Sequence, residues 1–495
     1  MLTADRVLMA DYRILLDGMF AAAQTTSVPE RLMRSFVAPP IPCNDGRATR
    51  APLGLRLVEA TLIREGYARD DVAIVPPEHL RRAVGPATRV VLVSSGDPLG
   101  LGMNDSTMSA IAGGEPYVHV WLRTMLRRLR AMRSAHPHLK VMVGGPGAWQ
   151  LGRNDVECAD LGIDVVFSGY AERDLAALVR EVADGPAIKL AHTASRVDAS
   201  DIPEILGPTS MGVVEISRGC GMGCRFCTLR AEPMVHLPVD KILHDVETNV
   251  RHGVTSVCLV SEDLLRYGGG NGKVRPEQLI ELVEAVRAVP GLRLIQTDHV
   301  NVSSVLQFPQ AELRRLHDGM TRGVRHEHLW VNIGVESASG ELIAANGCAA
   351  KIRPFHISEW EEAGEEAVRR LIAAGFIPMV SLVFGLPGET QEHVRRTLGL
   401  VKRLAGERLM IFPLFYAPLE HGRKPFGLGN MTPLHWRLFR LCYRQNFRWL
   451  PRVYWDNQRG AGVPLGSRLL MQAVGRANAL HWTFRFVCKS GKLFL

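Results

Sequence analysis

The chain has 495 residues, of which 46% are hydrophobic and 22% are charged. This composition is typical of a folded protein and excludes extensive disorder, and the length predicts two or three domains rather than one core. The net charge of +9 is uneven, because residues 421–495 hold 13 lysines and arginines against a single acid, Asp456. That segment carries +12, which leaves −3 for the first 420 residues.

No stretch of the sequence reaches the roughly 18 apolar residues that a membrane-spanning helix requires. The first residues, MLTADRVLMADYR, contain acids where a signal peptide needs a basic region. We therefore expect a cytoplasmic protein, with association to a membrane surface as an alternative. Six of the nine cysteines are scattered singly, which argues against a disulfide framework.

Strands and helices alternate along the first third of the chain. Hydrophobic periodicity predicts short strands at 88–95, 139–147 and 163–169, and helices at 53–67, 121–137 and 174–184. Such alternation predicts an α/β fold with a parallel, doubly wound, Rossmann-like sheet. A ligand of this sheet is expected at the carboxyl ends of its strands.

A second alternating series predicts six strand–helix units, which is typical of a partial (β/α)6 barrel of the TIM type. We therefore divide the chain into an N-terminal segment with the Rossmann-like domain (1–190), a linker (191–210), the partial barrel (211–420) and a mainly helical, basic and aromatic C-terminal region (421–495). The predicted strands of the barrel are 213–220, 256–263, 292–300, 328–337, 376–388 and 408–416.

Three cysteines follow the first of these strands in the stretch SRGCGMGCRFCTLR, where Cys220, Cys224 and Cys227 form a C-x3-C-x2-C run. A structural zinc site needs four protein ligands, whereas three thiolates suit an iron–sulfur cluster that keeps one iron open. A zinc knuckle, or three unrelated core cysteines, is the alternative. The spacing and the position after a strand favour the cluster.

This run, with Phe226 just before its last cysteine, resembles the radical S-adenosylmethionine (SAM) superfamily. The resemblance implies that Cys220, Cys224 and Cys227 hold a 4Fe-4S cluster whose fourth iron is chelated by SAM. It also implies an external one-electron reductant of the flavodoxin or ferredoxin type. One electron then cleaves SAM to a 5′-deoxyadenosyl radical that abstracts hydrogen from an unactivated carbon.

Further segments resemble the superfamily in order along the chain. In NIGVESAS (332–339) the resemblance assigns Glu336 to the ribose of SAM, and in VSLVFGLPGET (380–390) it assigns Gly385 and Pro387 to the adenine. Glu262, with its neighbours Ser261 and Asp263, loosely matches the segment that binds the methionine amino group. The alternatives are that a glutamate at the end of a strand is simply an exposed charge, and that the Gly-x-Pro-Gly segment is simply a turn.

Glycines and serines follow two strands of the N-terminal sheet, in VSSGDPLGLGMNDST (93–107) and VGGPGAWQL (143–151). This set resembles the cobalamin-binding domain that precedes the barrel in one class of radical SAM enzymes. The resemblance places Gly144 and Gly145 along the nucleotide tail of cobalamin, Ser94 and Ser95 near it, and the 97–107 loop toward the corrin. The first histidine is His79, in another loop, so we expect no histidine on the lower face of cobalt. A flavodoxin-like module without a cofactor is the alternative.

Arginines and aromatic residues alternate in the C-terminal region, with Arg437, Arg440, Arg444 and Arg448 at helical spacing. Three interpretations remain open: helices that close the barrel, association with an anionic membrane surface, and nucleic-acid binding, which lacks a recognised motif here. The HEH segment at 326–328 lacks the spacing of a metal site and is interpreted as a solvated turn.

Together these features predict a cobalamin-dependent radical SAM methyltransferase that acts on an unactivated carbon, or phosphorus, of a small-molecule or lipid-like substrate. The route that the resemblance implies runs through the 5′-deoxyadenosyl radical and methylcobalamin. The alternatives are a cobalamin-dependent radical SAM cyclase or oxidase without net methyl transfer, and a non-catalytic iron–sulfur protein.

Overall fold

The structure is a computed structural model that describes residues 1–495 apart from 153, 186–189, 231, 271, 325, 421–422 and 491–495, and apart from the side chains of 190, 489 and 490. The chain divides into two compact units. Unit 1 comprises Met1–Ser109, Gly113–Val213 and His244–Val254, and unit 2 comprises Ala110–Ala112, Val214–Leu243 and Thr255–Leu495.

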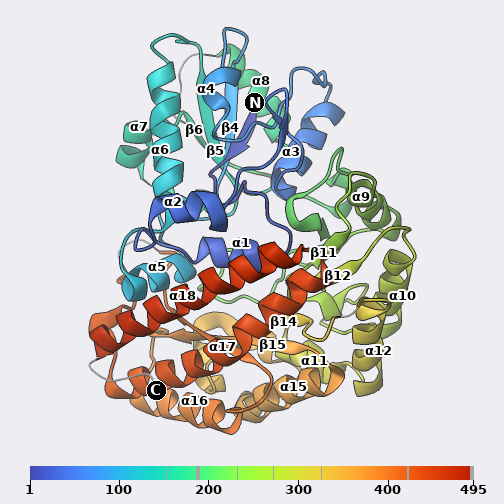
Figure 1. Ribbon diagram of the computed structural model, residues 1–495, viewed down its shortest axis with the longest axis vertical. Helices are drawn as coiled ribbons and strands as arrows, with labels where there is room; N and C mark the ends of the chain where they lie inside the picture. The colour runs from blue at the N-terminus through green and yellow to red at the C-terminus, as the bar shows by residue number, and fades with distance from the viewer. Residues whose placement is uncertain are drawn as a thin grey trace. The chain divides into compact units, whose positions relative to one another are not determined.

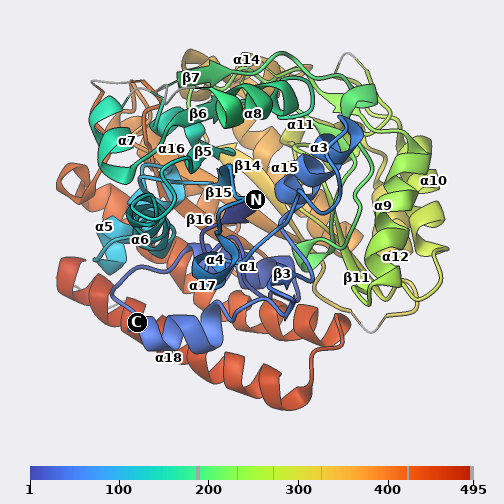
Figure 2. The same ribbon diagram turned by 90° about the horizontal axis from the view of Figure 1, so that it is seen from above.

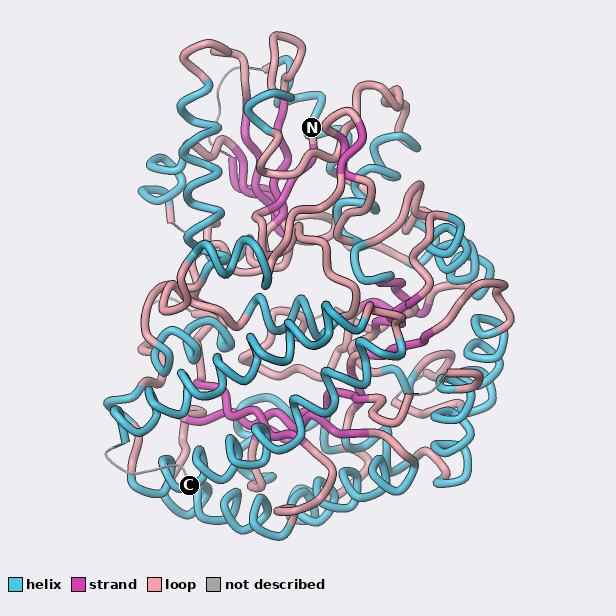
Figure 3. Tube along the Cα trace, in the orientation of Figure 1, coloured by secondary structure: helices cyan, strands magenta, loops and turns pink. Residues whose placement is uncertain are grey.

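Unit 1 contains a parallel sheet whose strands run side by side (Figure 3). Its order is β1-β4-β5-β6-β7, and Ile74 adds a parallel bridge to Leu2 on the outer side of β1. The chain therefore proceeds from β1 to one side and later, from β4, to the other side. This reversal between β1 and β4 is the topological switch point of a doubly wound sheet. The strands are β1 (Leu2–Ala4), β4 (Val90–Ser94), β5 (Lys140–Gly144), β6 (Val165–Ser168) and β7 (Leu190–Thr193).

Successive strand residues point to opposite sides of a sheet, and in this sheet the residues on both sides are apolar. Leu92 packs in a core with Leu55 of α3, while Val91 packs in a second core with Leu122 of α6. Figure 1 shows α6 and α7 on one side of the strands and α3 on the other. The helices are α1 (Leu15–Ala22), α2 (Glu30–Leu32), α3 (Leu53–Arg64), α4 (Leu80–Ala83), α5 (Met103–Ala112), α6 (Tyr117–Met132), α7 (Asp155–Leu161) and α8 (Leu175–Asp184).

Two features of unit 1 differ from the sequence prediction. β1 lies at the very start of the chain and was not predicted, because three residues are too few to show a period. The segment 191–210 was predicted as a linker, yet its first residues belong to β7, and Thr209 forms a parallel bridge with Ala51. A hairpin of β2 (Cys43–Asn44) and β3 (Arg47–Ala48) completes the strands of this unit.

Unit 2 contains two parallel sheets with the orders β12-β11-β8 and β13-β14-β15-β16. Each of the six strands predicted from the sequence is present, and the predicted third strand is divided into β12 and β13. Closure of these sheets into a barrel stays a prediction. The strands are β8 (Val213–Glu215), β11 (Ser256–Val260), β12 (Leu294–Thr297), β13 (His299–Val300), β14 (Trp330–Glu336), β15 (Ile377–Phe384) and β16 (Met410–Phe415), with an antiparallel pair β9 (Ser217–Arg218) and β10 (Val235–His236).

Helices separate these strands, as the sequence pattern predicted, although the part of the first helix from His244 onward belongs to unit 1. In Figure 1 the helices α10, α12, α15 and α16 lie along the outer side of the strands of unit 2. The helices are α9 (Val239–Arg251), α10 (Pro276–Arg287), α11 (Val302–Gln307), α12 (Gln310–Thr321), α13 (Gly340–Ile343), α14 (Ala349–Ile352), α15 (Trp360–Ala374) and α16 (Gln391–Arg403).

The C-terminal region forms two long helices, α17 (Pro433–Gly460) and α18 (Leu465–Ser490), which lie side by side (Figures 1 and 2). α17 packs on β16, the last strand of its sheet. The Asn446 side chain accepts a hydrogen bond from Ile411 N at 2.7 Å and donates one to Ile411 O at 2.7 Å. These bonds satisfy backbone groups that an edge strand otherwise leaves open, so α17 covers this edge of the sheet.

The single acid of the C-terminal region, Asp456, anchors α17 to the segment that enters β14. Its Oδ2 accepts hydrogen bonds from Glu327 N at 2.7 Å and His328 N at 2.8 Å, and lies 3.0 Å from His326 Nδ1. Although burial by itself raises the pKa of Asp456, the hydrogen bonds from His326 and His328 hold that pKa well below its usual range. The interpretation of the HEH segment as a solvated turn is therefore wrong, since His326 is buried against Asp456.

We expect Asp456→Ala to lower the unfolding temperature of the protein by several degrees. The substitution leaves two partly buried backbone N–H groups without their acceptor, and a group of this kind that stays unsatisfied costs up to about 1–3 kcal/mol. Because the pKa of Asp456 is depressed, this stabilisation is present at neutral pH and is lost only as pH falls below about 4. Differential scanning calorimetry measures the shift. The exposed Asp318 provides the matched control, and equal shifts for Asp318→Ala and Asp456→Ala contradict the anchor.

Candidate cluster and cofactor sites

The three cysteines of the run lie in one loop between β9 and β10. Cys220 N donates a hydrogen bond to Glu232 O at 2.9 Å, and Cys227 N donates one to Cys224 O at 3.0 Å. Arg266 Nη1 donates to Cys220 O at 3.1 Å. The backbone of this loop is thus held at its base and within its turns, so the three thiols are presented from one fixed segment.

A second segment of unit 2, 344–348, packs directly against the cysteine loop. Asn346 O accepts a hydrogen bond from Arg225 N at 2.9 Å, and Asn346 Nδ2 donates to Pro387 O at 3.0 Å. Gly347 has a φ of +89°, and a Cβ there would lie 2.5 Å from Gly223 O. Only glycine permits this approach. One asparagine therefore links the cysteine loop to the loop that follows β15.

The environment affects the three thiols differently. Burial raises the pKa of Cys220 to about 12 and also raises the pKa of Cys227. The pKa of Cys224 is lowered, first by a hydrogen bond with the Cys348 thiol and further by the Lys351 ammonium. A bound metal requires thiolates. The surroundings of Cys224 therefore favour its thiolate, while burial of Cys220 and Cys227 favours the neutral thiol.

Three thiolate donors from one loop suit a cluster that keeps one iron open. Within the described part of the chain, no three cysteine, histidine or acidic side chains are gathered closely enough to hold one ion. Cys224 interacts electrostatically with both Cys220 and Cys227, so the three thiols nevertheless share one region. In a 4Fe-4S cluster each thiolate binds a different iron, so the thiols need not converge on one point. Phe226, the residue before Cys227, is buried.

Glu336 ends β14 beside this loop in an unusual backbone conformation, with a φ of +63°. Its Oε1 accepts a hydrogen bond from Lys351 Nζ at 2.5 Å, and its Oε2 accepts one from Ser381 at 3.3 Å. Both members of the ion pair are buried. Burial alone lowers the pKa of Lys351, but the Glu336 carboxylate and the Cys224 thiol raise it above its usual value. Lys351 therefore carries its charge at neutral pH.

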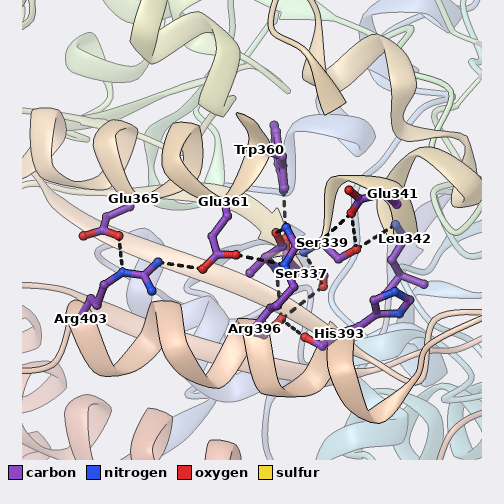
Figure 4. Close-up of polar contacts among 12 residues, drawn as sticks. Ser337, Ser339, Glu341, Leu342, Trp360, Glu361, Glu365, His393, Arg396 and Arg403 are labelled. Carbon is purple, nitrogen blue, oxygen red and sulfur yellow. Dashed lines mark hydrogen bonds and ion pairs between the residues drawn. The ribbon is translucent and has the colours of Figure 1, made fainter. Parts of the chain in front are cut away.

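The backbone that follows Glu336 is held from two neighbouring helices, α15 and α16. Trp360 Nε1 donates to Ser337 O at 2.9 Å, and Thr397 Oγ1 accepts from Ala338 N at 3.1 Å. Figure 4 shows how ion pairs join the two helices around this contact. The pairs are Arg396 with Glu341 and Glu361, and Arg403 with Glu361 and Glu365. The position of the Glu336 carboxylate is thus fixed by the surrounding scaffold.

Of the three polar residues after β11, the structure brings Glu262 to the cysteines. Burial raises its pKa, and the Glu262 carboxylate in turn raises the pKa values of Cys220 and Cys227. Asp263 instead accepts hydrogen bonds from Asn301 at 3.1 Å and from Ser304 at 2.5 Å, which gives it a structural role. Glu262 is the acid in this segment that acts on both Cys220 and Cys227, whereas Asp263 acts on Cys220 alone.

Gly385 and Pro387 lie in the tight loop after β15. Gly385 N donates to Glu389 Oε1 at 3.0 Å, and Gly385 packs against the ring of Phe426, with no room for a Cβ. Glu389 is in turn 2.8 Å from His435 Nε2 of α17. The tight turn is sufficient to explain why glycine and proline occur at these positions. The link from Pro387 through Asn346 nevertheless connects this loop to the cysteines.

In unit 1 the four residues predicted for cobalamin gather at the carboxyl edge of the sheet. Ser94 of β4 pairs with Gly144 of β5, and Ser95 N donates to Gly144 O at 3.0 Å. Gly145 has a φ of +94°, and a Cβ there would lie 2.8 Å from Ser94 Oγ. The glycine thus allows the two loops to approach each other closely. Its neighbours are protein atoms, so Gly145 does not by itself mark a ligand cradle.

Unpartnered polar atoms lie at the same edge, near the switch point of the sheet. Ser95 Oγ and Asp5 Oδ2 are buried and have no hydrogen-bond partner among the described residues. Burial raises the pKa of Asp5 to about 7. In the first turn of α5, burial and a hydrogen bond with Asp97 raise the pKa of Asp105 to about 9. Orphaned polar groups at a switch point fit a polar ligand there.

Sequence reasoning missed several residues that the fold brings to these two places. Asn346, Cys348 and Lys351 have no spacing signal, because they reach the cysteine loop from 120 or more positions further along the chain. Asp5 follows a strand too short to recognise. His119 of α6 lies beside Gly100 in the loop after β4. Of these residues, only Asp5 had a sequence signal, because it is an acid that directly follows the first apolar residues of the chain.

Comparison with known proteins is consistent with this geometry. Residues 214–401 match the model of the Radical SAM superfamily. The chain is 24% identical over 375 residues to a tRNA-2-methylthio-N(6)-dimethylallyladenosine synthase of Desulfosudis oleivorans, covering 73% of this chain and 75% of that protein. It is 27% identical over 321 residues to the enzyme of the same name from Pseudomonas syringae pv. syringae, covering 63% of this chain and 66% of that protein.

The fold is also similar to that of TsrM from Kitasatospora setae, a radical S-adenosylmethionine methyltransferase solved with tryptophan and a SAM analogue bound. The similarity covers 84% of this chain and 74% of TsrM, with a TM-score of 0.54 and 15% identity. A second TsrM structure, with cobalamin and a 4Fe-4S cluster bound, matches with the same TM-score and 16% identity. Residues 214–401 of this chain therefore form a radical SAM superfamily domain.

Proposed function

We propose that this protein is a cobalamin-dependent radical SAM methyltransferase that methylates an unactivated carbon, or phosphorus, of a small-molecule or lipid-like substrate. One observation carries the proposal. The chain combines a three-thiol loop beside the ends of parallel strands with a second, doubly wound parallel sheet whose switch point holds unpartnered polar atoms. The fold similarity to TsrM extends over 84% of the chain and so includes more than the radical SAM domain.

When bound, the 4Fe-4S cluster, SAM and cobalamin would supply electron transfer, hydrogen abstraction and the methyl group. The residues of the chain hold and orient these groups. Cys220, Cys224 and Cys227 would bind the cluster, and Glu336 and Glu262 would bind SAM beside it. Lys351 neutralises Glu336 and favours the Cys224 thiolate, so it acts as a positioning residue. Ser94, Ser95, Gly144 and Gly145 mark the edge that would receive cobalamin.

A second candidate is transfer of a methylthio group, which the names of the sequence relatives suggest. Such a reaction needs a sulfur donor besides SAM. A second iron–sulfur cluster would need several thiolate ligands, and residues 1–213 contain only Cys43 and Cys158. Cys158 is buried and donates to Leu151 O at 3.4 Å. The cysteine content therefore favours methyl over methylthio transfer.

The protein purified without oxygen tests this function directly. We expect it to retain cobalamin, to form 5′-deoxyadenosine from SAM under reduction, and to move label from the methyl group of SAM into the cobalamin fraction. In a product, a gain of one methylene supports methylation. An added sulfur indicates methylthio transfer, and loss of hydrogen without added carbon indicates a cyclase or oxidase. Absence of both 5′-deoxyadenosine and labelled cobalamin would leave a non-catalytic iron–sulfur protein.

Four cysteines lie in one region, and the proposal assigns only three of them to iron. We expect Cys220→Ala, Cys224→Ala and Cys227→Ala each to lose most of the bound iron and the visible absorbance after anoxic reconstitution. Cys348→Ala is the matched control, because Cys348 contacts Cys224 but lies outside the loop. It should keep its iron. Iron retained by any of the first three variants, or lost from Cys348→Ala, contradicts the ligand assignment.

The role of Lys351 predicts a specific pattern of stability. Lys351→Met leaves the buried Glu336 carboxylate unpaired, which costs about 3 kcal/mol. The double variant Glu336→Gln/Lys351→Met removes both charges and should recover most of this loss. Calorimetry of the cluster-free protein measures the unfolding temperatures. Arg322→Met breaks the exposed pair with Glu284 and should change little. Equal losses in the single and double Lys351 variants would show that the ion pair is not the cause.

A further inference from the structure

A stripe of exposed apolar side chains runs along one face of α18. Leu465, Leu469, Ala473, Leu480 and Phe484 recur at intervals of four or seven residues, which places them on the same side of a helix. Leu480 is 72% exposed, Phe484 66%, and Leu465 and Leu469 are each 56% exposed. We name these five residues the outer stripe. A stripe this long on a protein surface is a feature of interaction sites.

The opposite face of α18 is already used. Phe486 is fully buried, with its ring centroid 5.2 Å from that of Phe439 and 4.7 Å from that of Tyr443 in α17. Trp482 lies beside Tyr443 at 6.0 Å. These contacts hold α18 against α17 and leave the outer stripe of α18 uncovered. No helix in the described part of the chain is long and apolar enough to cross a membrane.

The two C-terminal helices also carry exposed arginines. On α17 the exposed cations are Arg437, Arg444, Arg448 and Arg452, and on α18 Arg476 is exposed near the stripe. None of these five arginines forms an ion pair with an acid among the residues that the structure describes. The guanidinium groups of Arg448 and Arg452 lie 5.7 Å and 5.1 Å from the ring of Trp449. The C-terminal region thus carries both exposed arginines without an acidic partner among the described residues and exposed apolar side chains.

We propose that α18 docks on the surface of an anionic lipid bilayer, with the outer stripe in the interface and the arginines at the lipid phosphates. A helix that is apolar on one side and flanked by arginine is suited to this position. A second copy of the chain would bring two surfaces of the same positive charge together, which is unfavourable. Nucleic acid would use the arginines but leave most of the stripe exposed, because Phe484 is its one aromatic side chain and its leucines and alanine cannot stack on bases.

Vesicle sedimentation of the full chain tests the proposal. Wild-type protein should bind vesicles of phosphatidylcholine with about 30% phosphatidylglycerol, bind vesicles of phosphatidylcholine alone at least about tenfold more weakly, and dissociate as salt rises. Leu480→Asp/Phe484→Asp should reduce binding to the anionic vesicles by about tenfold or more. Arg437→Glu/Arg444→Glu should weaken binding mainly at low salt. Circular dichroism and 5′-deoxyadenosine formation should match the wild type in both variants.

Val156→Asp is the matched control, since Val156 is 82% exposed on α7 of unit 1 and is not part of the stripe. It should bind vesicles as the wild type does. The proposal is overturned if the stripe variant binds anionic vesicles normally, or if both vesicle types bind equally. It is also overturned if the substitutions abolish a dimer seen by light scattering, or binding of bulk tRNA, while vesicle binding is absent. The outcome does not depend on the catalytic activity that we propose.

Discussion

A buried ion pair between Lys351 and Glu336 organises the candidate active region of this protein. Removing two charges from water is costly, and the attraction between them repays that cost only when the geometry is close. Here the distance is 2.5 Å, and Ser381 satisfies the second carboxylate oxygen. The same ammonium lowers the pKa of Cys224. The ion pair thus links the end of β14 to the cysteine loop. The same contact sets both the charge and the position of the Glu336 carboxylate.

The strands β4, β5 and β6 of unit 1 and the six predicted strands of unit 2 could be predicted from sequence, because each is a short apolar run whose period is local. The cysteine loop could be predicted for the same reason, since three thiols in eight residues are visible without any fold. Asn346 and Lys351 could not be predicted. They reach the loop from the segment after α13, where Gly347 adopts a φ of +89°, and no local pattern encodes that approach. Asp5 and β1 were missed because the first strand has only three residues.

The glycines of unit 1 lie at the sheet edge where the sequence predicted them, but two different physical reasons can explain why glycine occurs there. Gly145 lies at the predicted sheet edge, yet its missing side chain is required by Ser94 and Ser95 of the adjacent loop. Close packing between loops and close approach to a ligand select the same residue. The buried oxygens of Asp5 and Ser95 carry different information, because a polar atom without a partner is costly unless something binds it. They therefore support a ligand at this edge more strongly than the glycines do.

The contacts of the two long C-terminal helices help to distinguish the roles that the sequence left open for the basic region 421–495. α17 is attached to the sheet by Asn446, which is neutral, and by Asp456, which is acidic. Covering the sheet therefore does not require the arginines, which lie on the outside of these helices. Nor does it require the outer stripe of α18, because Trp482 and Phe486 already make the contacts with α17. The exposed arginines of α17 form no ion pair with the acids that the structure describes, although Arg448 and Arg452 lie against the ring of Trp449. The anionic interface that we propose accounts for these arginines and for the outer stripe at once.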